Sequence, residues 1–205
     1  MTEANVERLI VAARTGSCET LGQLLQLYRN YLTILASSQL GARLRTRVSP
    51  SDIVQETMLA AHRDFQQFRG SGEREFLGWL RQVLINTMHH AVEMHVKAQR
   101  RDIRREISLE QIGRRFDQSA TNFVHALADP GPSPSAYARR RETAVDLADQ
   151  LAKLRPHYRD VIVLRNLQGL SFEEIGERMG RTAGAVRMLW LRAMEKFKQV
   201  YQADE

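Results

Sequence analysis

The sequence has few features of a protein from an oxidising compartment or a membrane. Its 205 residues include one cysteine, Cys18, so no disulfide can form within the chain. No apolar run reaches the roughly 18 residues that span a bilayer, and the N-terminal segment MTEANVERLI is charged, unlike a signal peptide. We therefore expect a protein of the reducing cytoplasm without membrane insertion, in which Cys18 is a small buried residue.

Motifs of catalysis and metal binding are also missing. The chain has no glycine-rich phosphate loop, no Ser, His and Asp pattern, and no paired acids in a plausible cleft. His89, His90 and His95 come closest to a metal set, but His90 and His95 are five residues apart, which fits one helical face poorly. We therefore expect no enzyme, no cofactor and no metal.

Charge and proline placement indicate what the chain does contain. Lys and Arg total 30 against 24 Asp and Glu, which gives a formal net charge of +6 and favours polyanionic partners. Three of the five prolines fall between Ala128 and Tyr137, which predicts a linker. Residues 6–105 and 143–201, on either side of it, have helical periodicity. We predict an all-α protein of two small helical domains, joined by a flexible linker at residues 106–142.

The clearest helix of the first domain begins after Ser49, which can cap it, with Pro50 in the first turn and Asp52 three residues after the cap. Gly70 and Gly72 are predicted to end it. The predicted buried stripe consists of Val54, Met58, Ala61, Phe65 and Phe68. Another face carries Asp52, Gln55, Glu56 and Leu59.

The next helix is predicted to run from Glu73 toward Arg101. Its core stripe consists of Leu77, Leu80, Leu84, Met88 and Ala91. Its polar face consists of Gln82, Asn86, His89, His90 and Glu93. Residues 86–105 carry five Lys or Arg and two Asp or Glu, and a basic helix end of this kind can follow a phosphate backbone. A solvated helix end whose cations complement the helix dipole explains the same spacing equally well.

The second domain is predicted to contain four helices. Their core residues are Leu147, Leu151, Leu154, Val161, Leu164, Leu167, Phe172, Ile175, Met179, Val186, either Leu189 or Trp190, and Ala193. Gly169 ends the second helix, and Ser171 with Glu174 makes a capping box for the third. Gly180 then makes a turn, and Thr182 caps the fourth helix. This order is the helix-turn-helix pattern.

In that motif the N-terminal part of the last helix enters the major groove of DNA. The corresponding residues here are Arg181, Thr182, Ala183, Gly184, Arg187 and Met188. The small residues at 183–185 permit close approach, and Arg187 and Arg192 are placed for base edges or phosphates. Residues 176–200 carry six Lys or Arg and two Glu, so the charge supports the shape. The alternative is an ordinary helical hairpin with a solvated basic face.

Three segments resemble the bacterial sigma-70 family of small, two-domain, extracytoplasmic-function type. SFEEIGERMGRTAGAVRMLWLRA resembles region 4, and DIVQETMLAAHRDFQQFRG resembles region 2 with its D-[LIV]-V-Q-E core. FLGWLRQVLINTMHHAV resembles the promoter-recognising helix that comes next in the family. Their order and separation also match. The resemblance implies a sigma factor, which binds core RNA polymerase and directs promoter-specific transcription initiation.

The resemblance also implies roles for individual residues. Polymerase binding would involve Asp52, Gln55, Glu56 and Leu59. Recognition of the −10 element, with capture of melted non-template bases, would involve Gln82, Asn86, His89, His90, Lys97, Arg100, Arg101 and Arg104, and Arg105 would also hold the DNA backbone. Recognition of the −35 element as duplex would involve Arg181, Thr182, Ala183, Gly184, Arg187, Met188 and Arg192. An anti-sigma protein is a common partner in the family, but no residue here identifies one.

The sequence departs from the family pattern at two places. Met188 and Leu189 stand where the family often has Ser followed by Arg or Leu, so the −35 sequence is not predicted. The stretch from Leu40 to Pro50 is longer and more basic than expected, and we assign it no function.

Two rival classes of function remain. A helix-turn-helix regulator acting without core polymerase leaves the D-I-V-Q-E face unexplained, and an enzyme with a DNA-binding tail lacks a catalytic constellation.

Overall fold

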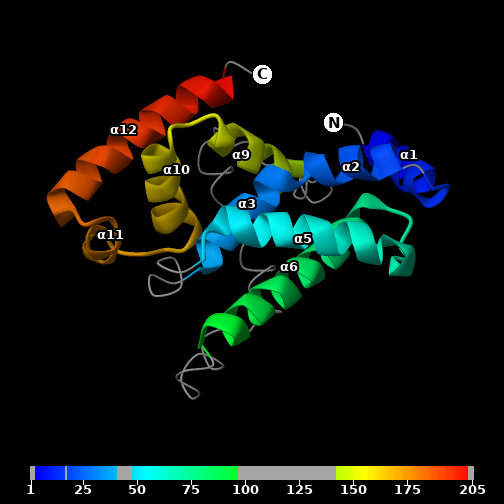
Figure 1. Ribbon diagram of the computed structural model, residues 1–205. Coiled ribbons are helices and arrows are strands. Elements are labelled where there is room, and N and C mark those ends of the chain that lie inside the picture. The colour runs from blue at the N-terminus through cyan, green and yellow to red at the C-terminus, as the bar shows by residue number, and fades with distance from the viewer. Residues whose placement is uncertain (1–2, 17, 41–47, 97–141, 203–205) are drawn as a thin grey trace. The chain divides into compact units, whose positions relative to one another are not determined.

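The computed structural model describes residues 3–16, 18–40, 48–96 and 142–202. The chain divides into two compact units, residues 1–112 and 113–205, and each is described by itself. Every regular element within the described ranges is helical (Figure 1), which confirms the predicted all-α class. The domain limits and the linker at 106–142 stay predictions, because residues 97–141 lie outside the described ranges. Most of the basic stretch between Leu40 and Pro50 also lies outside them.

The described part of unit one is a bundle of helices around an aromatic core. Its elements are α1 (Glu3–Arg14), α2 (Cys18–Leu27), α3 (Arg29–Gln39), α5 (Pro50–Asp64), the short 3-10 turn η1 (Phe65–Gln67) and α6 (Glu73–Val96). α5 packs against α3 and α6, and α1 packs against α2 (Figure 1). Tyr28, Tyr31 and Phe76 are among the largest fully buried side chains. The sequence analysis placed none of these three rings in the core.

α5 begins after the predicted cap, Ser49, and Asp52 completes a capping box with it. The amide of Asp52 donates to Ser49 Oγ at 3.2 Å, and the amide of Ser49 donates to Asp52 Oδ2 at 3.4 Å. Pro50 lies in the first turn, where its missing amide hydrogen removes no helical bond. These contacts satisfy amides that every helix start leaves unpaired. The start of α5 therefore depends on residues within four positions of one another.

The predicted end of α5 was wrong. The helix ends at Asp64 and passes into η1, so it stops before Gly70 and Gly72. The amide of Phe68 donates to the carbonyl of Phe65 at 2.9 Å, and this tighter turn keeps both rings in the core. Of the predicted stripe, Val54, Ala61, Phe65 and Phe68 are buried, whereas Met58 is half-buried. Ile53 and Thr57 complete the buried face.

The loop between η1 and α6, residues 68–72, is held from two sides. The guanidinium of Arg14 donates to the carbonyl of Phe68 at 3.3 Å and to the carbonyl of Gly70, and it lies 5.5 Å from the centre of the Phe68 ring. The carboxylate of Glu75 accepts hydrogen bonds from two loop amides at 2.6 and 3.2 Å. These bonds lower the pKa of Glu75. The loop that leads into α6 is therefore fixed by α1 as well as by α6 itself.

α6 packs on the bundle with the predicted stripe. Its five members are buried: Leu77, Leu80, Leu84, Met88 and Ala91. The hydroxyl of Tyr28 donates to Glu73 Oε1 at 2.8 Å, and Arg81 Nε donates to the hydroxyl of Tyr31 at 2.5 Å. Burial raises the pKa of Tyr28, and the Glu73 carboxylate raises it further. The phenol therefore stays a neutral hydrogen-bond donor that fixes α6 against the start of α3.

The described part of unit two comprises α9 (Glu142–Ala152), α10 (Pro156–Ile162), the π-helical turn η3 (Val163–Leu167), α11 (Phe172–Met179) and α12 (Ala183–Gln202). α12 packs against α9, α10 and α11 (Figure 1). The buried core includes Leu147, Leu151, Leu154, Val161, Leu164, Leu167, Ile175, Val186, Leu189 and Ala193. Phe172, Met179 and Trp190 are half-buried. The Phe172 ring lies under the guanidinium of Arg165, 4.6 Å away, and 5.9 Å from the Trp190 ring.

The turn between α11 and α12 requires glycine at two positions. Gly180 has φ 64°, a conformation that favours glycine, and its amide donates to the carbonyl of Gly176. The amide of Arg181 donates to the same carbonyl at 2.9 Å. A Cβ at Gly176 would lie 2.6 Å from the carbonyl oxygen of Arg181. The backbone of the turn therefore approaches α11 more closely than any side chain would allow.

Candidate functional site

The first predicted surface is the exposed face of α5. Asp52, Gln55, Glu56 and Leu59 are all exposed, as expected. Leu59 is 65% exposed to solvent, although it is a large apolar residue. Ile53, Val54 and Thr57 are buried on the opposite side. The 3.6-residue period of α5 therefore presents two carboxylates, one amide and one leucine together on its outer face.

The second predicted surface is the polar face of α6. Gln82, Asn86, His89 and His90 are exposed. Gln82 Nε2 donates to Asn86 Oδ1 at 3.0 Å, a bond in which the amide nitrogen of Asn86 takes no part. The predicted basic continuation lies outside the described residues: Lys97, Arg100, Arg101, Arg104 and Arg105. The described part of this surface therefore consists of amide and imidazole groups, and its predicted cations lie outside the described residues.

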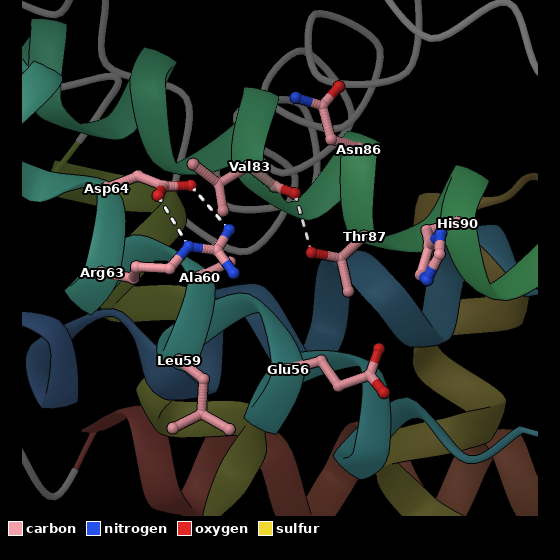
Figure 2. A pocket seen from close by; sticks show the side chains of 9 residues that line it. All are labelled: Glu56, Leu59, Ala60, Arg63, Asp64, Val83, Asn86, Thr87 and His90. Carbon is pink, nitrogen blue, oxygen red and sulfur yellow. Dashed lines mark hydrogen bonds and ion pairs between the residues drawn. The ribbon is translucent and has the colours of Figure 1, made fainter.

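The structure brings the first two surfaces together at one groove, shown in Figure 2. The groove encloses about 610 Å³ between α5 and α6. From α5 it is lined by Glu56, Leu59, Ala60, Arg63 and Asp64, and from α6 by Val83, Asn86, Thr87 and His90. Two members of each predicted set thus line it: Glu56 and Leu59 of the polymerase-binding set, and Asn86 and His90 of the DNA-binding set. This groove was not predicted from the sequence, because it depends on how the two helices pack.

Arg63 and Asp64 form a charged pair at the edge of the groove. Arg63 Nε donates to Asp64 Oδ1 at 2.8 Å and Arg63 Nη2 donates to Asp64 Oδ2 at 2.9 Å (Figure 2). The hydrogen bonds from Arg63 lower the pKa of the Asp64 carboxyl, so both groups are ionised at neutral pH. This pair of adjacent, oppositely charged residues was not predicted from the sequence.

The third predicted surface is the start of α12. Arg181, Thr182, Gly184, Arg187, Met188 and Arg192 are exposed, and Ala183 is half-buried. Thr182 caps the helix as predicted, since its Oγ1 accepts a hydrogen bond from the amide of Ala185 at 3.2 Å. Trp190 Nε1 donates to Asn166 Oδ1 at 3.0 Å, which fixes α12 against η3. The helix-turn-helix therefore presents its arginines outward from an anchored scaffold.

Cys18 corrects one expectation. Its side chain is exposed rather than buried, because it is the first residue of α2 and the buried face of that helix is formed by Leu21, Leu24 and Leu25. Among the described residues, no three His, Cys, Asp or Glu side chains are grouped so that they could hold a metal ion. Within the same residues, no helix combines the length and the apolar character needed to traverse a bilayer.

Comparison with known families and proteins agrees with this geometry. The model of sigma-70 region 2 matches residues 24–101, and the model of sigma-70 region 4 matches residues 144–197. The first match contains α5, α6 and their groove, and the second contains the helix-turn-helix. Together the two matches cover most of the residues that the structure describes.

Three relatives that cover most of the chain are named as RNA polymerase sigma factors. The chain is 27% identical to the ECF RNA polymerase sigma-E factor of Haemophilus influenzae, over 96% of this chain and 95% of that protein. It is 26% identical to the ECF RNA polymerase sigma factor SigD of Mycobacterium tuberculosis, over 97% and 84%. It is 30% identical to the RNA polymerase sigma-H factor of Pseudomonas aeruginosa, over 74% and 72%. The chain therefore belongs to the sigma-70 family of RNA polymerase sigma factors, in its extracytoplasmic-function branch.

Proposed function

We propose that this sigma factor docks on core RNA polymerase through the outer face of α5 and directs it to promoters with a −10 and a −35 element. α6 and the basic segment after it recognise and melt the −10 element, and α12 recognises the −35 element as duplex. The observation that carries the proposal is the groove between α5 and α6, because it joins the polymerase-binding face to the DNA-binding face. The chain itself is not an enzyme in this scheme.

Polymerase docking is supported by the composition of the α5 face. A face with two carboxylates and an exposed leucine suits a partner that offers cations around an apolar patch. Charges at such a contact steer the partner and exclude wrong ones, whereas the leucine adds buried apolar area. The start of the helix that carries this face is capped and its other side is buried, so the backbone of the face is in place before binding.

Promoter melting is supported by the groups on α6. A base that leaves the duplex needs hydrogen-bonding groups at its edge and a surface on which to stack. Asn86 and Gln82 supply amides already oriented by their mutual hydrogen bond, and His89 and His90 supply imidazole rings on the exposed face. The partners are then core polymerase, duplex promoter DNA and the melted non-template strand, and an anti-sigma protein that covers these surfaces is a further candidate.

Reconstitution tests the proposal. The full-length protein is mixed with bacterial core RNA polymerase and a genomic promoter library, and the transcripts are sequenced. We expect start sites downstream of one shared two-part motif. If the protein fails to bind core polymerase but binds an operator tightly by itself, it is a regulator that acts without the enzyme, and the proposal is wrong.

A charge reversal on α5 tests the docking face. Glu56→Lys leaves the α5 capping box intact, unlike Asp52→Ala, which removes one of its bonds. We expect affinity for core polymerase to fall about tenfold or more, because a cation replaces an anion within the contact. Glu7→Lys makes the same charge change at an exposed position of α1 and serves as the control. Equal affinities for the two variants, measured by competition for core polymerase, would exclude Glu56 from the interface.

A further inference from the structure

Two large apolar side chains are exposed on α12, the helix predicted to recognise the −35 element. Met188 is 51% exposed to solvent and Leu191 is 47% exposed. They lie three residues apart on α12, so they share one face of the helix. The opposite side of α12 is occupied by the buried residues Val186, Leu189 and Ala193. Exposure of the pair is therefore not a result of incomplete packing, since α12 already has its full core stripe.

The surroundings of this pair are basic. Arg187 lies one turn before Leu191 and Arg192 lies one turn after Met188, and both arginines are exposed. Gly184, one turn before Met188, has no side chain that would hold a partner away from the helix, and a Cβ built there meets nothing within 4 Å. The face thus combines two cations, two apolar side chains and, at Gly184, a position without a side chain that could keep a partner away.

An occupant of this face must itself combine negative charge with exposed apolar groups. The major groove of DNA meets both requirements, because phosphates flank it and each thymine presents its C5 methyl group there. A G·C pair presents no methyl group in that groove, so it offers Met188 and Leu191 no comparable apolar contact. The pair is therefore suited to A·T pairs in preference to G·C pairs.

We propose that Met188 and Leu191 contact the C5 methyl groups of thymines in the −35 element, so that this element contains thymine, on either strand, opposite each side chain. Arg187 and Arg192 hold the backbone or adjacent base edges on either side. The inference rests on the proposed role of α12 and adds to it the class of base that the helix selects. It also gives a positive role to Met188, where the family often has a polar residue.

Deoxyuridine provides the test, because it pairs like thymidine and lacks only the methyl group. The −35 element is first obtained from the transcripts that the reconstituted holoenzyme produces. Each thymine of that element is then replaced by deoxyuridine in turn, and the affinity of the holoenzyme for the promoter is measured. We expect a loss of about fourfold at two positions, one for each side chain, which corresponds to losing the burial of one methyl-sized group, and no change at the remaining thymines.

Two variants assign the effect to the side chains. Met188→Ser and Leu191→Ser alter exposed positions, so the core of α12 is retained. Each variant should bind thymine and deoxyuridine equally at one of the sensitive positions and stay sensitive at the other. Gln199→Ser, at an exposed position near the end of α12, should keep the full response. Circular dichroism of each variant confirms the helical fold before binding is compared.

The remaining outcomes overturn the inference. An active promoter that tolerates deoxyuridine at every position, or a −35 element without thymine on either strand, removes the methyl contact and leaves the sigma-factor function intact. A methyl effect that persists in both serine variants assigns the contact to other residues. Loss of core polymerase binding by Met188→Ser would show that a protein surface covers the pair. Failure of the holoenzyme to start transcription at any promoter overturns the proposed function together with the inference.

Discussion

Gly176 and Gly184 lie on the two helices of the helix-turn-helix, and an added methyl group would meet opposite surroundings at these positions. At Gly176 the new Cβ would lie 2.6 Å from the carbonyl oxygen of Arg181, which belongs to the backbone and cannot rotate away. At Gly184 nothing lies within 4 Å. One residue is therefore glycine because the fold requires it, and the other is glycine at a position where the fold permits alanine.

We expect Gly176→Ala to lower the free energy of unfolding of unit two by about 1–3 kcal/mol, because the turn must move to admit the methyl group. Gly184→Ala should raise it by about 0.4–1 kcal/mol, since alanine restricts the unfolded chain and fits the helix. Urea unfolding followed by Trp190 fluorescence in a Trp79→Phe background, where Trp190 is the one remaining tryptophan, measures both. Equal effects for the two substitutions would contradict the close approach at Gly176.

At the level of a whole element, the start of α11 depends on a charged capping box. The amide of Ser171 donates to Glu174 Oε2 at 2.7 Å, and the amide of Glu174 donates to Ser171 Oγ at 3.2 Å. The bond from the Ser171 amide lowers the pKa of Glu174 below its ordinary value of 4.5. A depressed pKa means that the ionised carboxylate stabilises the folded state above the unfolded pKa, and that this contribution is lost as the pH falls through the folded pKa.

Glu174→Gln should therefore destabilise unit two at pH 6, and the difference from wild type should shrink as the pH falls below 4.5. Below the folded pKa both proteins carry an uncharged group at this position, so the charge-dependent part of the difference disappears. Trp190 fluorescence in the same tryptophan background, recorded at pH 3–6, measures it. Glu173→Gln removes the same charge one residue away from the box and is the control. A difference independent of pH would mean that the Glu174 charge does not contribute to the cap.

Elements also show how far the sequence alone could lead. The starts of α5 and α11 were predicted correctly, because a capping box is formed by residues three positions apart. The end of α5 was predicted wrongly, because burial of Phe65 and Phe68 overrode the glycine signal that follows them. Capping contacts between residues three positions apart could be predicted from the sequence. The effect of core packing on where the helix ends could not.

In the candidate site, too, local features could be predicted from the sequence and features that depend on long-range packing could not. Which residues of α5 and α6 are exposed was predictable from helical periodicity. The groove was not, because it depends on how two helices pack, and neither was the contact of Arg14 with a loop 54–56 residues further along the chain. The core positions of Tyr28 and Phe76 were missed for the same reason, since their rings meet across the bundle at a centroid distance of 5.4 Å.

Across the whole molecule, the net charge of +6 conceals surfaces of opposite sign. The outer face of α5 carries Asp52 and Glu56, whereas the start of α12 carries Arg187 and Arg192. A chain with this division can offer anions to a protein partner and cations to DNA without one partner competing for the other surface. The overall charge therefore understates how basic this part of α12 is.

The salt dependence of DNA binding measures how many phosphates the cations of this surface contact. Each phosphate neutralised by the protein contributes about −0.9 to the slope of log K against log salt concentration for duplex DNA. We expect Arg192→Ala to reduce the magnitude of this slope by about 0.9 for holoenzyme binding to its promoter. Lys153→Ala removes a cation from the loop between α9 and α10 and should leave the slope unchanged. A slope unaffected by Arg192→Ala would place its guanidinium away from the phosphates.

The Arg14 contact has a consequence for recombining this fold with others. The match to the region 2 family begins at residue 24, but the guanidinium that supports the carbonyls of Phe68 and Gly70 comes from α1. A chimera that received only residues 24–101 would lose this support unless the host supplied a cation at the same place. The transferable module of this protein therefore begins with α1, upstream of the signature by which the family is identified.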